Sequence, residues 1–199
     1  FAFAWFDART RRLFLARDRV GIRPLYYTQT PQGAFVFGSE VKALIAHPEV
    51  TLQLDPVALD QIFTLWTSLT PRTVFQNIHE LSPGHTLLVD EKTLNVQPYW
   101  RLTFPPADEI PARPLGSALE EFHALFADAI RLRLRADVPV AAYLSGGIDS
   151  CTTCEFILRH TKASLKTFSV GFADAQYDEG EYQRQAAAHL GTQHALIHC

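Results

Sequence analysis

The chain has 199 residues, of which 47% are hydrophobic and 20% are charged, so it can bury a core and is not a disordered protein. Its net charge of −3 gives no overall basic field, which argues against a nucleic-acid-binding protein. The apolar stretches are interrupted well before about 18 residues, too soon for a membrane span. Three cysteines make no disulfide framework, so a cytoplasmic protein is expected. Methionine is absent even at position 1, which predicts an excised fragment.

Short strands and turns are predicted for the first half of the chain. Aromatic and aliphatic runs at 1–7 and 12–18 predict one hairpin. A second is predicted from 25–30 and 34–38, across the turn Pro31-Gln32-Gly33. A third is predicted from 86–89 and 93–97.

Two helices are expected between these hairpins. Ser39 is expected to cap a short helix whose apolar face carries Val41, Leu44 and Ile45. Asp55-Pro56 predicts the start of the next helix, because a proline at the first helical position loses no hydrogen bond. The apolar residues expected on the buried side of that helix are Val57, Leu59, Ile62, Phe63 and Trp66.

The pattern changes after a stiff, proline-rich segment at 105–116, which is predicted to be a linker. Ser117-Ala118-Leu119-Glu120 matches a capping box, and apolar residues continue at helical spacing to Ile130. The continuous apolar run at 138–144 is typical of a parallel strand buried on both faces. The segments that follow are a helix at 149–160, a strand at 165–170, a helix at 179–190 ending at Gly191, and a strand at 193–198. This alternation predicts two crossover units and a parallel sheet.

The segment 144–150, Leu-Ser-Gly-Gly-Ile-Asp-Ser, lies where the buried strand ends and the next helix begins, which is where open α/β sheets place ligands. Two adjacent glycines let backbone N–H groups wrap around an anion, and the helix points its positive end at the same place. Ser145 and Ser150 add hydroxyl groups, and Asp149 beside phosphates is a natural Mg²⁺ ligand. The spacing fits neither a Walker A loop nor Gly-x-Gly-x-x-Gly.

Ser-Gly-Gly-x-Asp-Ser after an apolar strand resembles the pyrophosphate-binding loop of ATP pyrophosphatases, which cleave ATP to AMP and pyrophosphate. The plainer alternative is a glycine turn that ends a strand, which the number of matched positions disfavours.

Other segments resemble a more specific family. Segments 17–27 and 37–44 closely resemble class II glutamine amidotransferase domains, and Leu81-Ser82-Pro83-Gly84-His85 and Pro98-Tyr99-Trp100 fit the same domains. In the second half the matching segments are 167–172, Tyr177-Asp178-Glu179 and 189–194. Together with the glycine loop, they resemble the glutamine-hydrolysing asparagine synthetase family over almost the whole chain.

The resemblance implies two truncated domains of different fold class. Residues 1–104 would form the C-terminal part of an α+β amidotransferase domain of the N-terminal-nucleophile type. After the linker, residues 117–199 would form the N-terminal part of an α/β parallel-sheet ATP-pyrophosphatase domain.

The implied activity is an ATP-dependent carbon–nitrogen ligase that makes asparagine. Aspartate would be activated by ATP and Mg²⁺ as a β-aspartyl-adenylate, and ammonia from glutamine would displace AMP. The resemblance implies that Ser145, Gly146, Gly147, Asp149 and Ser150 hold the pyrophosphate, with Asp149 at the metal, and that Leu144, Val170 and Gly171 lie at the ATP. The expected partners are therefore glutamine, aspartate and ATP, with no nucleic acid and no membrane; the resemblance also allows a homodimer.

The chain departs from the family at the glutaminase nucleophile, an N-terminal cysteine. Position 1 is Phe, and Cys151, Cys154 and Cys199 all lie in the second half, so no catalytic residue is expected in this fragment, which would be inactive by itself. Two alternatives stay open. One is a homologue with the same machinery that acts on another carboxylate, and the other is a non-catalytic scaffold, against which the intact loop argues.

Three further groups of residues invite a functional interpretation. Cys151-x-x-Cys154 could be a thiol pair, but two small residues packing a helix are favoured. A zinc site at His189, His194, His198 and Cys199 is disfavoured, because the matching family segment holds no metal. Arg17 and Asp18 are interpreted as an ion pair at a hairpin end, and so as markers of the fold.

Overall fold

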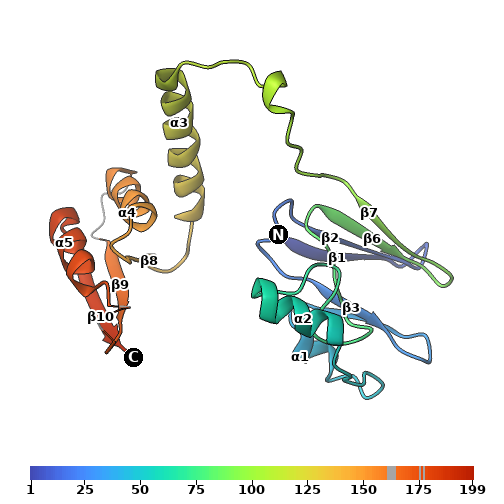
Figure 1. The fold of residues 1–199 in the computed structure, drawn as a ribbon. Helices are drawn as coiled ribbons and strands as arrows, with labels where there is room; N and C mark the ends of the chain where they lie inside the picture. The colour runs from blue at the N-terminus through green and yellow to red at the C-terminus, as the bar shows by residue number, and fades with distance from the viewer. Residues whose placement is uncertain (161–164, 175, 177) are drawn as a thin grey trace. The chain divides into compact units, whose positions relative to one another are not determined.

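The computed structural model describes residues 1–160, 165–174, 176 and 178–199, which fall into two compact units, Phe1–Pro105 and Pro106–Cys199 (Figure 1). Each unit has its own sheets and its own buried core. None of the described helices combines the length and the apolar character needed to cross a bilayer.

The first unit contains two antiparallel sheets. The four-stranded sheet has the order β1 (Ala2–Asp7), β2 (Arg12–Arg17), β6 (His85–Val89) and β7 (Leu94–Pro98). The three-stranded sheet has the order β4 (Phe35–Gly38), β3 (Tyr26–Gln29) and β5 (His79–Glu80). The three predicted hairpins are confirmed as β1–β2, β3–β4 and β6–β7. The sequence did not indicate β5, because a strand of two residues is too short to show a period.

Both sheets contribute to the core of the first unit. Leu15 of β2 and Leu87 of β6 are fully buried, and they cluster with Tyr27 of β3. Leu25 and Leu81, which flank the small sheet, complete the cluster.

The helix α1 (Val41–Leu44) begins differently from the prediction. Its N-cap residue is Glu40, whose backbone is extended and whose side chain makes no capping hydrogen bond, so the expected cap at Ser39 is wrong. The helix has a single turn and is held by Leu44, which is completely buried. Burial of one leucine therefore fixes this turn in place of a hydroxyl cap.

The helix α2 (Pro56–Leu65) begins where the sequence predicts. The carboxylate of Asp55 accepts hydrogen bonds from the N–H groups of Val57 at 2.9 Å and Ala58 at 3.3 Å. It thereby satisfies two of the donors that a helix leaves free at its start.

The buried side expected for α2 is wrong. Ala58 is the buried residue of this helix, while Val57 is exposed and Phe63 and Trp66 are 84% and 92% exposed. Leu59 and Ile62 are partly buried. Helical spacing shows which side chains share a face, but it does not show whether another element covers that face.

Arg17 and Asp18 are both buried, but they do not form the expected ion pair with each other. The guanidinium of Arg17 pairs with Glu80 at 2.7 Å and donates to the carbonyl groups of Arg23 (2.9 Å), Leu81 (2.6 Å) and Gly21 (3.1 Å). Arg17 therefore ties β2 to β5 and to the loop that follows β2.

The carboxylate of Asp18 closes that same loop. It accepts hydrogen bonds from the N–H groups of Val20, Ile22 and Arg23. Burial by itself would raise the pKa of Asp18, but the hydrogen bonds from the N–H groups of Arg23 and Ile22 lower it, and the pKa lies below its ordinary value.

The second unit is a parallel sheet with helices. Its elements are the 3₁₀ helix η1 (Ala107–Glu109), α3 (Leu115–Arg133), β8 (Ala141–Tyr143), α4 (Ile148–His160), β9 (Lys166–Gly171), α5 (Gly180–Leu190) and β10 (Gln193–His198). The strand order is β10-β9-β8 and both pairings are parallel, which confirms the predicted crossover units. Gly191 ends α5 with a φ of 65°, in the left-handed region, as predicted.

Two sequence predictions in this unit are wrong. The helix α3 begins at Leu115, so Ser117 lies inside it and cannot form the expected capping box. The strand β8 is shorter than 138–144 and lies at the edge of the sheet, where Val138 and Tyr143 are exposed rather than buried on both faces.

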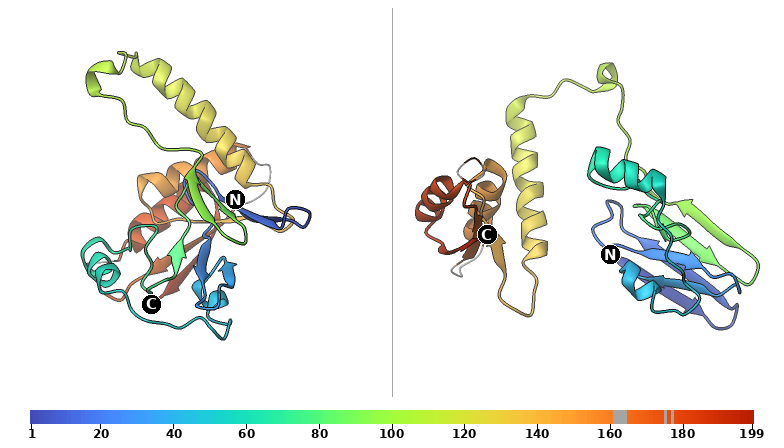
Figure 2. Two further views of the ribbon diagram at one scale, coloured as in Figure 1. Left: turned by 90° about the vertical axis from the view of Figure 1, so that its right-hand side faces the viewer. Right: turned by 60° about the horizontal axis from the view of Figure 1, so that its bottom comes forward.

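The core of the second unit joins its helices to the sheet. Phe126 of α3 meets Phe156 of α4 edge to face, with ring centres 4.9 Å apart, and the two helices lie side by side (Figure 2). Ile130, Leu144 and Cys154 belong to the same buried cluster. This packing holds the start of α4 against the end of β8.

Replacing Arg17 with Met should lower the free energy of unfolding of the first unit by about 3 kcal/mol, because the partly buried Glu80 loses its partner and three backbone carbonyl groups lose their donor. Urea unfolding measures this loss. Arg12→Met is the matched control: Arg12 pairs with Asp90 at 4.0 Å on the surface, so the change should be below about 0.5 kcal/mol. Equal losses in the two variants would contradict the anchoring role of Arg17.

Asp18 should make the first unit sensitive to acid. A carboxyl group whose pKa is lower in the folded than in the unfolded protein stabilises the fold above about pH 4, and that contribution is lost as the pH falls toward the folded value. Asp18→Asn should therefore be less stable than the wild type at neutral pH, and the difference should shrink as the pH is lowered from about 5 to 2. Urea unfolding at each pH measures it, and a difference independent of pH would contradict this prediction.

Candidate functional site

The glycine loop joins the end of a parallel strand to the start of a helix. Leu144 extends the ladder beyond β8, since its N–H donates to the carbonyl of Phe168 at 2.9 Å. The hydroxyl of Ser169 in turn donates to the carbonyl of Leu144. The helix α4 begins at Ile148, so the loop lies at the carboxyl end of the sheet and at the positive end of a 13-residue helix.

Two serine hydroxyls close the loop. The Oγ of Ser150 accepts from the N–H of Ser145 at 3.1 Å, donates to the carbonyl of Gly147 at 3.0 Å, and lies 3.0 Å from the Oγ of Ser145. The Oγ of Ser145 accepts from the N–H of Gly147 at 3.3 Å. The hydroxyls expected to face phosphate are therefore bonded to each other and to the loop backbone.

The two glycines have different surroundings. Gly146 has a φ of 84°, and a Cβ there would lie 2.7 Å from the Cβ of Tyr182 and 2.9 Å from the backbone nitrogen of Gln183. At Gly147, the Oγ of Ser145 lies 3.4 Å from such a Cβ, and among the described residues beyond the adjacent backbone no other atom comes within 4 Å. Gly146 therefore lets the loop pack against the start of α5, while Gly147 stays open to an approaching ligand.

A cavity of about 240 Å³ opens beside the loop. Its lining includes three of the residues expected at ATP or pyrophosphate, namely Leu144, Ser145 and Val170. Leu144 and Val170 come from the ends of the neighbouring strands β8 and β9, so the parallel pairing brings them together.

Gln183 and Glu179 also line this cavity. Glu179 belongs to the segment Tyr177-Asp178-Glu179 that carries the family resemblance, whereas no motif in the sequence indicates Gln183. Gln183 is only 4% exposed, and its Nε2 donates to the carbonyl of Val170 at 3.1 Å. It therefore ties α5 to the end of β9. A polar residue inside the amphipathic pattern of α5 was the only available signal, and that pattern alone does not distinguish a buried glutamine from an exposed one.

Gly171, another residue predicted at the ATP, does not line this cavity and packs against β10 instead. A Cβ on it would lie 2.9 Å from the Nδ1 of His198 on β10, which explains the glycine as a close contact between neighbouring strands.

Asp149 and the loop fit a magnesium–phosphate group. Asp149 is exposed in the first turn of α4, and Mg²⁺ is commonly held by one or two carboxylates together with phosphate oxygens. Within the described ranges, no group of three or more His, Cys, Asp and Glu side chains could hold a metal by itself. Any magnesium would therefore need oxygen ligands from the bound nucleotide.

The other candidates take part in packing. Cys154 lies in the buried cluster with Cys151 beside it, and burial, followed by the neighbouring Cys151, raises the pKa of the Cys154 thiol. The Nδ1 of His194 lies 3.0 Å from the hydroxyl of Thr167. Tyr177, in the motif before α5, lies outside the described residues.

The chain matches known families over both units. A model described as a glutamine amidotransferase domain matches residues 1–100, and one described as asparagine synthase matches residues 121–199. Glutamine-hydrolysing asparagine synthetase 3 of Bacillus subtilis is 37% identical over 193 residues, which is 94% of this chain and 30% of that protein. A putative glutamine-hydrolysing asparagine synthetase 2 of Methanocaldococcus jannaschii is 33% identical over 97% of this chain and 37% of its own length.

The amidase chyE of Penicillium rubens is also similar, with 34% identity over 99% of this chain and 31% of that protein. The chain thus spans about a third of the length of the curated relatives it matches.

Gly146→Ala should destabilise the second unit by about 2–3 kcal/mol, because its Cβ would collide with the backbone of α5 and its φ disfavours a side chain. Gly147→Ala is the matched control and should change the unfolding free energy by less than about 1 kcal/mol. Urea unfolding of the two variants tests the contrast. Equal destabilisation would contradict the contact between the loop and α5.

Proposed function

The chain belongs to the glutamine-hydrolysing asparagine synthetase family, and we propose that the protein uses ATP to activate the side-chain carboxylate of aspartate and then amidates it with ammonia from glutamine. The observation that carries this proposal is the loop of Ser145 to Ser150, which presents open backbone between a parallel strand and the positive end of α4.

The reaction proceeds in two displacements. The aspartate carboxylate oxygen bonds to the α-phosphorus of ATP, and the bond from that phosphorus to the bridging oxygen of the β-phosphate breaks, which releases pyrophosphate. Hydrolysis of glutamine gives glutamate and ammonia. The ammonia nitrogen then bonds to the activated carbonyl carbon, AMP leaves with the oxygen that joined it to that carbon, and the nitrogen loses a proton to give the amide.

The chain's own residues serve the first displacement by stabilising charge on the leaving pyrophosphate. The backbone N–H groups of the loop and the positive end of α4 would face this charge as it forms. Bound Mg²⁺, with Asp149 as its protein ligand, would neutralise part of the phosphate charge.

The serine hydroxyls would have two roles, first as hydrogen-bond partners within the loop and then as hydrogen-bond partners of the phosphate. Without a ligand, Ser145 and Ser150 hold the loop closed through their mutual hydrogen bonds. When phosphate oxygens arrive, rotation of either hydroxyl exchanges a bond within the loop for one to the ligand. Because a charge-assisted hydrogen bond is stronger than a neutral one, this exchange favours the bound state.

The cavity beside the loop is the proposed adenosine site. Leu144 and Val170 supply its walls from two neighbouring strands, and Gln183 fixes the end of β9 from α5. The nucleoside would lie against the strand ends while its phosphates reach the start of α4.

A second candidate is amidation of a carboxylate other than aspartate. Its support is that proteins with another name, the amidases chyE of Penicillium rubens and chry2 of Gibberella zeae, are 34% and 32% identical over 99% of this chain, so similarity alone does not single out aspartate as the acceptor. The activation step and its loop would be the same in both candidates.

The test is exchange of labelled pyrophosphate into ATP, catalysed by the full-length gene product. Exchange that requires aspartate is expected, because adenylation of the acceptor carboxylate is reversible. Exchange with another acid would support the second candidate, and no exchange with any acid would overturn both.

Asp149→Asn should lower the exchange rate at least about tenfold, since the magnesium–phosphate group loses its carboxylate ligand. The control is Asp137→Asn, an exposed carboxylate in the segment before β8, where the rate should stay within about twofold. An unchanged rate in Asp149→Asn would refute the role given to this residue.

A further inference from the structure

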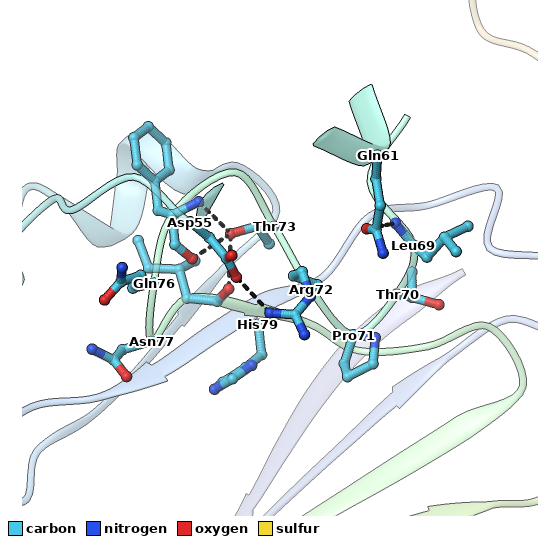
Figure 3. A pocket seen from close by; sticks show the side chains of 12 residues that line it. Asp55, Gln61, Leu69, Thr70, Pro71, Arg72, Thr73, Gln76, Asn77 and His79 are labelled. Atoms are coloured by element: carbon cyan, nitrogen blue, oxygen red, sulfur yellow. Dashed lines mark hydrogen bonds and ion pairs between the residues drawn. The ribbon is translucent and has the colours of Figure 1, made fainter. Parts of the chain in front are cut away.

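A larger cavity, of about 640 Å³, lies within the first unit, between the start of α2 and the segment from Leu69 to His79 (Figure 3). We propose that it is a binding site for a small carboxylate ligand, held by the guanidinium of Arg72. Its volume is in the range of small-molecule sites. Every residue that lines it belongs to the first unit, so the site is separate from the nucleotide loop.

Arg72 and Asp55 form the polar centre of this cavity. The Nη1 of Arg72 donates to the Oδ2 of Asp55 at 2.6 Å, while the Oδ1 of Asp55 caps α2 (Figure 3). The hydrogen bond from Arg72 is the largest reason why the pKa of Asp55 lies below its ordinary value. Both carboxylate oxygens are thus engaged, and the charge of Asp55 is paired with that of Arg72, which disfavours a cationic ligand.

Arg72 has donors to spare. A guanidinium carries five N–H groups, and among the described residues its one side-chain hydrogen bond goes to Asp55. The side chain is 44% exposed, against 12% for Asp55, so the remaining N–H groups are accessible from the cavity. Their flat arrangement suits the two oxygens of a carboxylate.

The amide groups around Arg72 add to this donor surface. The Oε1 of Gln61 accepts from the N–H of Leu69 at 2.9 Å, which turns the other end of the amide, an NH₂ group, away from that bond. Thr70 and Asn77 supply a hydroxyl and a further amide to the lining. The Gln61 amide thus adds a donor beside those of Arg72, and the side chains of Thr70 and Asn77 can also donate to a carboxylate.

The charge of the cavity favours a monoanion over phosphate. Asp55 already neutralises part of the charge of Arg72 and would repel a doubly charged group. His79 also lines the cavity; burial, and then the charge of Arg72, lower the pKa of its imidazole, so it adds no second cation at neutral pH. One shared guanidinium is enough for a single carboxylate.

The walls of the cavity are already in place. The hydroxyl of Thr73 lies 2.8 Å from the carbonyl of Ile78 and 3.1 Å from that of Phe75, which folds the segment back on itself. The Nε2 of Gln76 donates to the carbonyl of Leu54, next to the start of α2. Binding of a ligand would therefore cost little conformational entropy, because the site is already ordered.

The test is a ligand-observed NMR titration of the full-length gene product with butyrate, and with butyramide as its uncharged match. Butyrate carries no amino group, so it is a poor mimic of the amino acids proposed as substrates. Butyrate is expected to bind in the millimolar range and butyramide at least about tenfold more weakly. No binding of butyrate, or equal binding of the two, overturns the proposal.

Two substitutions should act in opposite directions. Arg72→Gln should weaken butyrate binding about tenfold. Asp55→Asn should strengthen it several-fold, about threefold or more, because Asn still caps α2 but no longer competes for the guanidinium. Structural damage would not tighten binding, so affinity in Asp55→Asn at or below that of the wild type overturns the proposal.

Two further variants control for nonspecific charge attraction and for misfolding. Arg12→Gln removes an exposed arginine on β2 and should leave butyrate binding unchanged; an equal loss there would show nonspecific charge attraction and overturn the proposal. If Arg72→Gln does not fold, Arg72→Lys keeps the charge but not the flat fork. It should also bind butyrate more weakly than the wild type, and undiminished affinity would count against the site.

Discussion

The second unit depends on one close approach, between the turn at Gly146 and the first residues of α5. A side chain at position 146 would stand less than 3 Å from the backbone of Tyr182 and Gln183, so the turn and α5 can meet only through a glycine. That meeting sets where α4 begins, and it also places Gln183 beside the carbonyl of Val170. The close packing of the loop against α5, which brings Gln183 to the wall of the cavity beside the loop, therefore depends on one missing Cβ.

The same turn explains why the loop can be both ordered and receptive. Its polar groups are not left unsatisfied, because Ser145 and Ser150 bond to each other and to the backbone. These hydrogen bonds lie in an exposed part of the loop, so they order the turn without being enclosed in the core. Hydroxyl groups can rotate toward phosphate, whereas a fixed backbone partner could not be exchanged as easily.

Most elements of the fold could be predicted because their signals are local. Alternating runs gave the three hairpins, Asp55-Pro56 gave the start of α2, and Gly191 gave the end of α5. The errors concern properties that depend on distant neighbours. Whether Phe63 of α2 is covered, and whether β8 has a partner on both sides, are decided by other parts of the chain and leave no period in the sequence.

The caps at Ser39 and Ser117 failed for a different reason. A serine before an apolar run is compatible with a cap, but other residues decide where each helix begins. The helix α1 begins at Val41, in the same turn as the buried Leu44, and α3 begins at the exposed Leu115, directly after Pro114. The two proposed sites show the same division between local sequence signals and contacts that form only on folding. The glycine loop could be found because its residues are contiguous, while Gln183 and the Arg72 cavity could not, since each depends on segments that meet only after folding.

The charged residues discussed above therefore fall into two groups, according to whether other parts of the chain already occupy their hydrogen-bonding groups. The side chains of Arg17 and Asp18 form hydrogen bonds with the loop backbone. Their presence in the segments that resemble the family therefore reflects a role in the fold and not in the chemistry. Asp149 is exposed at the start of α4, and Arg72 keeps donors beyond its bond to Asp55. A charged side chain that is not fully hydrogen-bonded within the fold can bind a ligand. Both proposed sites are therefore built on charged residues of this kind, Asp149 and Arg72.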